Sequence, residues 1–400
     1  MRGILAAAAV SLCDCSFTTS LDGLNDGCPP GRSSCDGDAA NGCEADTRGD
    51  LASCGGCGLT CASSPNSDPV CAEGACALLC DAGFADCNED VADGCESDPA
   101  TDASHCGACN HDCQGGECED GRCQPITIWS GPMEDPPLRA TGIAVGPDGV
   151  YWCVSDAIMA ANLDGSGARA LAPAVGPLRL ATDGSFVYWS NSNGIVMKVP
   201  TSGGPDTEVA SADGRDLRAA GGFVYYVDAA GDPGTRRISR ARADGGEVID
   251  LATGEDMPWG LAIDATHVYW TGDADGSIKK APLDGSGPTT WLGEGFGGSY
   301  SIAVAAETVF WSASSIGQVP KGGGEASALA PDQSQGCVAA DEAFVYWTGF
   351  GDKSIKKAPV GGGDPITLAT IEGSPDVIAL SETAIYWTVY DGPAVMKLAK

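Results

Sequence analysis

The stretch GLAID at residues 260–264, followed by HVYWTG at residues 267–272, is one copy of a pattern that recurs along the chain. Its marker is a pair of adjacent aromatic residues. The first positions of successive pairs differ by 37, 37, 44, 41, 36 and 40 residues. Such a period, rich in strand formers and glycine turns, is typical of the blades of a β-propeller. The seven pairs are Tyr151-Trp152, Tyr188-Trp189, Tyr225-Tyr226, Tyr269-Trp270, Phe310-Trp311, Tyr346-Trp347 and Tyr386-Trp387.

Each repeat predicts four short strands: an inner strand, a second strand with the aromatic pair, a third strand, and an outer strand after an Asp-Gly or Gly-Gly turn. These dipeptides favour hairpins. Because successive strand residues face opposite sides, the two aromatics of a pair should face the two neighbouring blades. Crowding near the axis favours small residues on the inner strands, and the residues assigned to that role are Ala144, Ala181, Ala219, Ala262, Ala303, Ala339 and Ala379.

The last repeat ends after its third strand and so lacks an outer strand. Before the first repeat, PITI at residues 125–128 matches PITL at residues 365–368, the outer strand of the sixth repeat. We therefore expect residues 125–130 to supply the missing strand and close the ring, which removes exposed sheet edges. The sequence predicts an all-β fold: a seven-bladed propeller closed by an N-terminal strand, after a small disulfide-rich region.

The repeated sequence pattern, Gly-Leu-Ala-Ile-Asp, then Tyr-Trp-Thr, then Leu-Asp-Gly-Ser, resembles the YWTD propeller repeats of the low-density-lipoprotein-receptor class. The resemblance extends over residues 138–400. The resemblance implies a propeller fold with a protein or ligand bound at one face. Two features depart from the family. Those receptor propellers have six blades, and the motif aspartate is replaced by Gly272, Gly349 and Val389 after three of the Tyr-Trp-Thr copies.

Sixteen of the twenty cysteines lie in a tandem pair of eight-cysteine modules with a period of 52 residues. Such density favours disulfides formed in an oxidising compartment, and eight cysteines allow 105 pairings. The block resembles cysteine-rich tandem repeats of secreted proteins from myxobacteria-like bacteria, which implies an extracytoplasmic stalk or spacer. The cysteines are Cys28, Cys35, Cys43, Cys54, Cys57, Cys61, Cys71 and Cys76, then Cys80, Cys87, Cys95, Cys106, Cys109, Cys113, Cys118 and Cys123.

Two metal hypotheses attach to this block. The C-x2-C pairs suggest a zinc site, although the nearby histidines, His105 and His111, occur in the second module alone. Two acidic loops suggest a calcium site, since calcium prefers alternating oxygen ligands before a glycine turn. The alternative for the loops is solvated turns in which the side chain accepts a backbone N–H. The loop residues are Asp36, Asp38 and Asn41 in module one, and Asn88, Asp90 and Asp93 in module two.

Residues 1–13 resemble a secretory signal: a short basic start, an apolar run too short to span a membrane, then Cys13. VSLC at residues 10–13 also resembles a bacterial lipobox, with Leu12 in place of the usual small residue, so Cys13 is a candidate for lipidation. The layout is a signal at 1–13, a linker at 14–27, modules at 28–79 and 80–123, and a propeller at 124–400. The protein is expected to be periplasmic, secreted or on the cell surface.

The net charge of −33 argues against binding to nucleic acids or anionic membranes. The three histidines form no Ser/His/Asp set or paired metal site, and Cys153 and Cys337 are expected to be buried free thiols. The Lys279-Lys280 and Lys356-Lys357 pairs are expected to be solvated or to join acids of neighbouring blades.

The sequence therefore predicts a monomeric, non-enzymatic protein without a cofactor, calcium apart, that binds a protein, glycan or small ligand. The alternative is a secreted metal-dependent lactonase or lyase. Propeller geometry places a binding site on the face formed by the loops between blades and between second and third strands. Candidates there are Asp228, Trp259, Asp273, Tyr300, Tyr390 and Asp391.

Overall fold

The computed structural model describes residues 28–36, 38, 42–132, 139–295, 298, 300–331 and 336–400. The predicted signal, the linker, Cys13 and Asn41 lie outside these residues. The chain divides into two units, Met1–Asp98 and Pro99–Lys400, so the second cysteine module extends over both. All regular elements in the described residues are strands, and no helix there is long and apolar enough to cross a membrane.

All sixteen cysteines of the two modules are disulfide-bonded. Module one joins its first cysteine to its third, second to fifth, fourth to seventh and sixth to eighth. Module two repeats three of these connections. The bonds are Cys28–Cys43, Cys35–Cys57, Cys54–Cys71 and Cys61–Cys76, then Cys80–Cys95, Cys106–Cys118 and Cys113–Cys123.

The cysteine-rich region forms three two-stranded ribbons, whose disulfides stand in for a hydrophobic core. In the first unit β1 (Arg32–Ser33) pairs with β2 (Ala45–Asp46), and β3 (Ser67–Ala72) pairs with β4 (Ala75–Cys80). In the second unit β5 (Cys118–Glu119) pairs with β6 (Arg122–Cys123).

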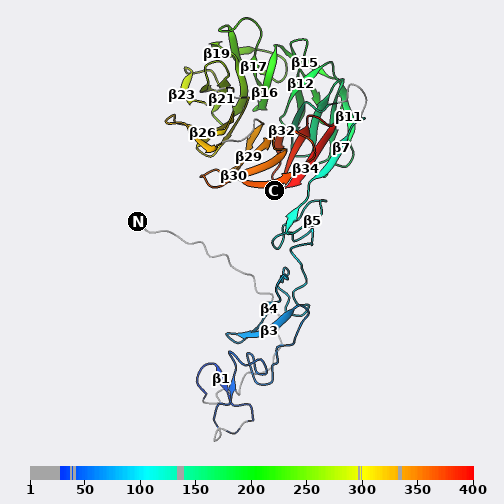
Figure 1. The fold of residues 1–400 in the computed structure, drawn as a ribbon, viewed down its shortest axis with the longest axis vertical. Helices are drawn as coiled ribbons and strands as arrows, with labels where there is room; N and C mark the ends of the chain where they lie inside the picture. The colour runs from blue at the N-terminus through cyan, green and yellow to red at the C-terminus, as the bar shows by residue number, and fades with distance from the viewer. Residues whose placement is uncertain are drawn as a thin grey trace. The chain divides into compact units, whose positions relative to one another are not determined.

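The second unit is a seven-bladed propeller, as predicted, in which every blade is a four-stranded antiparallel sheet (Figure 1). Blade one contains β8 (Gly142–Val145), β9 (Val150–Val154), β10 (Ala157–Ala161) and β11 (Arg169–Pro173). Blade two contains β12 (Pro177–Thr182), β13 (Phe186–Asn191), β14 (Ile195–Pro200) and β15 (Thr207–Ser211). Blade three contains β16 (Gly214–Ala220), β17 (Phe223–Asp228), β18 (Arg236–Arg242) and β19 (Val248–Glu255).

Blade four contains β20 (Pro258–Ile263), β21 (His267–Gly272), β22 (Ser277–Pro282) and β23 (Thr290–Glu294). Blade five contains β24 (Ser301–Ala305), β25 (Thr308–Ser312), β26 (Ile316–Pro320) and β27 (Ser327–Ala330). Blade six contains β28 (Val338–Ala340), β29 (Phe344–Gly349), β30 (Ser354–Pro359) and β31 (Ile366–Thr370). Blade seven contains β32 (Pro375–Leu380), β33 (Ala384–Val389) and β34 (Ala394–Ala399).

The N-terminal strand β7 (Ile126–Ser130) completes blade seven. It pairs antiparallel with β34, from Ala394 opposite Ser130 to Lys397 opposite Ile126. Figure 1 shows β7 beside the C-terminal strand. The predicted closure is therefore confirmed, and the two ends of the propeller sequence lie in one sheet.

The aromatic pairs hold neighbouring blades together. Seven hydrophobic clusters occur among the described residues, one at each blade interface. The first aromatic of a pair faces the following blade and the second faces the preceding one. Tyr151 thus shares a cluster with Trp189, and Tyr386 of the last blade shares one with Trp152 of the first. The six tryptophans of the pairs are at most 1% exposed.

All seven alanines lie on inner strands as predicted, but one of them is out of register with the other six. The first aromatic of each pair lies opposite an inner-strand alanine in six blades, for example Ala181 opposite Tyr188. In blade three Arg218, not Ala219, lies opposite Tyr225. The alanine was chosen by residue type, whereas the register follows a constant offset of seven residues before the aromatic. An arginine therefore takes the place of a small residue beside the channel.

Turn aspartates tie adjacent blades together on the face where the inner strands end. Asp264 accepts hydrogen bonds from Thr266 N, His267 N and the Tyr269 hydroxyl, and forms an ion pair with Lys321 of the next blade. Asp341 repeats this arrangement with Lys400 as its ion-pair partner. Burial favours a higher pKa for each carboxyl, but these bonds outweigh it and hold both pKa values below the usual range.

These carboxyls predict acid sensitivity. Their folded-state pKa values lie below the unfolded value of about 4, so their stabilisation is complete above that pH and is lost as the pH falls through the folded values. We expect the melting temperature to drop below about pH 4. The drop should be smaller for the double variant Asp264→Asn/Asp341→Asn, measured relative to its own value at pH 7. Asp206→Asn, at an exposed turn, is the control and should retain the parent's pH profile.

Residues 99–123 pack on the same face of the propeller. His111 Nε2 lies 2.9 Å from Lys400 O, and Gln114 Nε2 donates to Thr383 O at 2.9 Å. Lys397 Nζ donates to Gln114 O. The end of the second cysteine module thus occupies the face where the inner strands end.

Candidate functional site

The opposite face, where the inner strands begin, is formed by the loops between blades and between second and third strands. We call it the mouth face. A cavity of about 370 Å³ opens there along the propeller axis and is lined by inner strands of all seven blades. This volume is within the range of small-molecule sites in proteins, about 300–1,000 Å³.

The register of the inner strands places one residue of each blade at equivalent depth, nine residues before the first aromatic. These residues are Gly142, Arg179, Asp216, Gly260, Ser301, Cys337 and Val377. Small or apolar residues predominate, as packing around an axis requires. Arg179 and Asp216, together with Arg218 two residues farther on, are the charged exceptions and mark blades two and three.

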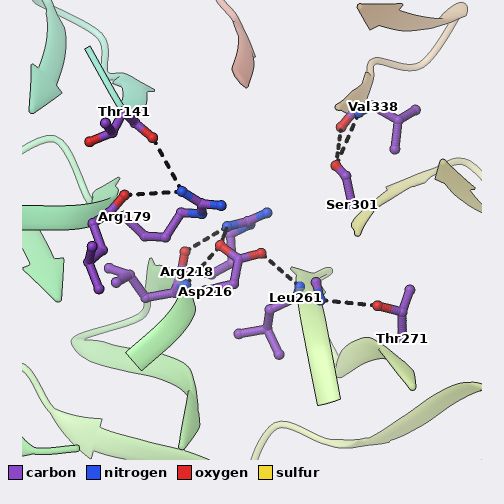
Figure 2. Close-up of polar contacts among 11 residues, drawn as sticks. Thr141, Arg179, Asp216, Arg218, Leu261, Thr271, Ser301 and Val338 are labelled. Atoms are coloured by element: carbon purple, nitrogen blue, oxygen red, sulfur yellow. Dashed lines mark hydrogen bonds and ion pairs between the residues drawn. The ribbon is translucent and has the colours of Figure 1, made fainter. Parts of the chain in front are cut away.

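Figure 2 shows Arg179, Asp216 and Arg218 converging at the mouth. Asp216 forms an ion pair with Arg218 at 2.7 Å and accepts the backbone N–H of Leu261, in the next blade, at 2.8 Å. Arg179 Nη1 donates to Thr141 O and Leu178 O, both at 3.2 Å. The Asp216 carboxylate is therefore engaged within the fold, whereas the bonds of both arginines to described residues all come from Nη1.

Asp376 and Cys337 add two titratable groups. Burial raises the pKa of Asp376, opposed by the charge of Arg179. The pKa of Cys337 is raised to about 12, chiefly by burial and then by the Asp376 charge. Burial likewise raises the pKa of the Cys153 thiol, which lies between blades one and two. Both thiols are free, and at neutral pH both are protonated.

This predicts unreactive thiols in the folded protein. With a pKa of about 12, roughly one Cys337 in 10⁴ is a thiolate at pH 8, against about one in four for an unperturbed cysteine. In a variant with Cys13 and Cys15 replaced by serine, Ellman's reagent should therefore release far less than one equivalent from the folded protein in the first minutes, and two equivalents in guanidinium. Cys153 is buried as predicted, whereas Cys337 lines the cavity and is only partly buried, so the prediction for it was wrong in that respect. Rapid release of a full equivalent from the folded protein would contradict the raised pKa of these thiols.

Two aromatic–arginine clusters flank the mouth. The Arg215 guanidinium lies 4.6 Å from the centre of the Trp259 ring, which makes an edge contact with Tyr300 at 5.7 Å. The Arg139 guanidinium lies 4.7 Å from the Tyr390 ring. That ring makes an edge contact with Phe350 at 5.4 Å. The first cluster joins blades three to five. The second joins blades six, seven and one, so it depends on ring closure.

Exposed apolar side chains gather on the same face. Eight large hydrophobic residues are exposed in the described part of the second unit. Five lie on the mouth face: Val175, Leu178, Tyr300, Phe350 and Tyr390. The other three, Val248, Trp291 and Ile366, lie on outer strands. Apolar residues concentrated around a polar cavity are typical of an interaction surface.

The six candidates predicted for this face do not form one site in the structure. Trp259 and Tyr300 are in contact, and Asp273 lies near the same loop, beside Gly298. Tyr390 belongs to the other cluster. Asp228 is buried in an ion pair with Arg237, and Asp391 accepts two hydrogen bonds from Ser374. Those two carboxylates therefore maintain the fold locally.

Sequence reasoning missed three charged residues that line the channel, Arg179, Asp216 and Arg218. It also missed Asp376, next to the lining residue Val377, and the two arginines of the aromatic clusters, Arg139 and Arg215. Alignment of the seven inner strands by their constant offset from the aromatic pair would have singled out most of them. Charged side chains occur there where other blades carry small or apolar ones.

The predicted metal sites gain no support from the sulfur atoms. The sulfurs of Cys54, Cys61 and Cys76 lie within 4.8 Å of one another, but all three are in disulfides, and a disulfide offers no thiolate for zinc. A second such group in module two is disulfide-bonded too.

The acidic loops form the side-chain turns considered as the alternative to calcium. Asp36 accepts Asp38 N, Asn88 accepts Asp90 N, and Asp90 accepts Ala92 N. Asn88 also donates to Asp93. Calcium binding there stays a prediction.

The histidines lie away from the mouth. His267 begins β21 at the opposite face, where its Nδ1 lies 2.7 Å from the Thr266 hydroxyl. His105 and His111 belong to the cysteine-rich region, and no described residue lining the cavity is a histidine. The lysine pairs join blades in part: Lys279 contacts Glu255 of blade three, and Lys280 donates to Lys321 O of blade five.

Comparison with known proteins supports the fold alone. No family model matches the chain, and no curated protein sequence matches it. Among solved structures, virginiamycin B lyase from Staphylococcus aureus is similar over 69% of this chain and 98% of its own, with a TM-score of 0.58 and 15% identity. BamB from Moraxella catarrhalis is similar over 70% of this chain and 97% of its own, with a TM-score of 0.50 and 12% identity.

A third similar structure is YCF48 bound to D1 peptide. It covers 69% of this chain and 96% of its own, with a TM-score of 0.53 and 10% identity. An enzyme and a protein solved with a bound peptide thus share this architecture. The chain is an all-β propeller protein, and its many disulfides indicate an oxidising, extracytoplasmic compartment. The YWTD assignment stays a prediction.

Proposed function

We propose that this protein is an exported, non-enzymatic binding protein whose propeller holds a peptide segment of a partner protein on the mouth face. The observation that carries the proposal is the concentration of exposed apolar side chains on this one face, where the two aromatic–arginine clusters flank the cavity. Tryptophan, tyrosine and arginine are the residue types enriched at the energetic centres of protein interfaces.

The cavity favours a segment over a flat contact. Its mouth lies between the two aromatic clusters, so a chain lying across Trp259 and Tyr390 would pass over the channel and could place one group inside it. Loops at one face of a rigid scaffold commonly carry binding function. The solved complex of YCF48 with D1 peptide is a precedent for peptide binding by a propeller of this shape.

A lyase-type activity is the weaker candidate. A catalytically inactive variant of virginiamycin B lyase, with a histidine replaced by alanine, has been solved with quinupristin. In the described residues of this chain, the cavity lining includes no histidine. The cysteine there is a protonated thiol and Asp216 is already paired, so neither is suited to act as nucleophile or general base.

The proposal is tested with peptides selected from a random displayed library against the full-length protein. Trp259→Ala and Tyr390→Ala should each weaken the selected peptides by roughly 30-fold, since truncation at an interface centre costs about 2 kcal/mol or more. Trp291→Ala removes a tryptophan that is 48% exposed on an outer strand, and affinity should change less than about twofold. Peptides that resist both mouth-face substitutions would refute the proposal.

A further inference from the structure

Two opposite charges stand at the mouth without pairing. Arg179 is on blade two and Asp376 is on blade seven. Among the described residues no ion pair joins Asp376 to any cation, and its carboxylate receives no hydrogen bond. Arg179 uses Nη1 on two backbone carbonyls, which leaves Nη2 and Nε without a described partner.

The two charges are nevertheless close enough to act on each other and on one thiol. The charge of Arg179 opposes the effect of burial on Asp376, and both charges act on Cys337 in blade six. Desolvated opposite charges that lie within electrostatic range would gain from direct contact. The two residues lie on blades two and seven, on either side of blade one, and Val377 next to Asp376 lines the same cavity as Arg179.

Arg218 extends the positive side. Its Nη1 is bound to Asp216 Oδ1 and Leu217 O, and its other guanidinium nitrogens have no described partner. Arg179 and Arg218 both line the cavity, and Asp376 precedes the lining residue Val377. The Asp216 carboxylate also lines the cavity but is already bound by Arg218 and by the backbone N–H of Leu261. The groups left to meet a ligand are the remaining guanidinium nitrogens and the Asp376 carboxylate, which together form a dipolar site.

We infer that the channel mouth binds a small zwitterion of the amino-acid type, with its carboxylate held by Arg179 and Arg218 and its ammonium held by Asp376. A plain anion would meet Asp376 unfavourably, and a metal cation would meet the two arginines unfavourably. A molecule with both charges on a short skeleton satisfies both sides at once. Planar guanidinium groups suit a carboxylate because they can donate two parallel hydrogen bonds.

This site is separate from the aromatic rim proposed to hold the peptide segment, and it does not depend on it. The volume of about 370 Å³ accommodates a free amino acid without the rim. The two proposals can therefore fail independently. Free amino acids test the channel, and displayed peptides test the rim.

The experiment is calorimetric titration of the full-length protein with each standard amino acid, then with the amide and the N-acetyl derivative of the tightest binder. We expect at least one amino acid to bind with a dissociation constant near or below about 1 mM. The amide lacks the carboxylate and the N-acetyl derivative lacks the ammonium, so each should bind at least tenfold more weakly to the unaltered protein.

Near-isosteric variants locate the site. Arg179→Gln and Asp376→Asn should each weaken the amino acid at least tenfold while the melting temperature shows that the fold persists. Arg242→Gln, at the exposed end of β18, and Asp206→Asn, in an exposed loop, both lie away from the mouth; they are the matched controls and should bind as the parent does. No binding by any amino acid, equal binding of a derivative lacking one charge, or indifference to both channel variants would each overturn the inference.

Discussion

Deletion of residues 125–131 is expected to lower the free energy of unfolding by at least about 4 kcal/mol, because truncating one buried isoleucine alone costs about 2–5 kcal/mol. The segment contains β7, whose Ile128 is 9% exposed and whose Trp129 lies 5.7 Å from the Trp152 ring. Its loss also exposes the edge of β34. Chemical denaturation of the deleted and parent proteins, with all disulfides intact, measures the difference.

A milder pair of variants serves as the control for this deletion. Ile128→Ala removes a buried side chain from β7, whereas Ile366→Ala removes a side chain that is 50% exposed from the outer strand of blade six. The first should destabilise the protein by about 2–4 kcal/mol and the second by under about 1 kcal/mol. A deleted protein that melts at the parent temperature would show that closure by β7 does not stabilise the ring.

Trp347→Ala should destabilise the propeller by about 3–5 kcal/mol, the usual effect of removing a buried aromatic side chain. Trp347 is 0% exposed and lies in the cluster between blades five and six, with Phe310 from the preceding blade. Its indole N–H has no partner among the described residues, so the loss concerns packing alone. Urea denaturation followed by circular dichroism measures it.

Two comparisons isolate the packing effect. Trp291→Ala, at an outer strand, should cost under about 1 kcal/mol. Trp347→Phe should cost less than Trp347→Ala because it leaves a smaller void. Equal destabilisation by the buried and the exposed tryptophan substitutions would contradict the role of the aromatic pairs at the blade interfaces.

The repeat could be predicted from the sequence because its signals are local. An aromatic pair has to face two blades, so its spacing gives the blade count, and the match between residues 125–128 and 365–368 located the closing strand. The disulfide pairing could not be predicted, since eight cysteines at given spacings allow many connections. The structure supplies it, and the equivalent bonds of the two modules agree.

The channel site was predictable in part. The loop candidates Trp259, Tyr300 and Tyr390 lie on the mouth face, where propeller geometry places them. Arg179, Arg218 and Asp376 were missed because their meeting depends on the register among blades far apart in the sequence. Arg218 was hidden by the adjacent Ala219, which fits the expected residue type but lies one position out of register.

The most direct test of the account is to map where a selected peptide is crosslinked to the full-length protein. The peptide would carry a photoreactive benzophenone, and mass spectrometry would identify the labelled residues. The account predicts labels in the mouth-face loops, around residues 173–179, 256–260 and 389–393. Labels confined to the outer strands or to residues 28–123 would contradict it.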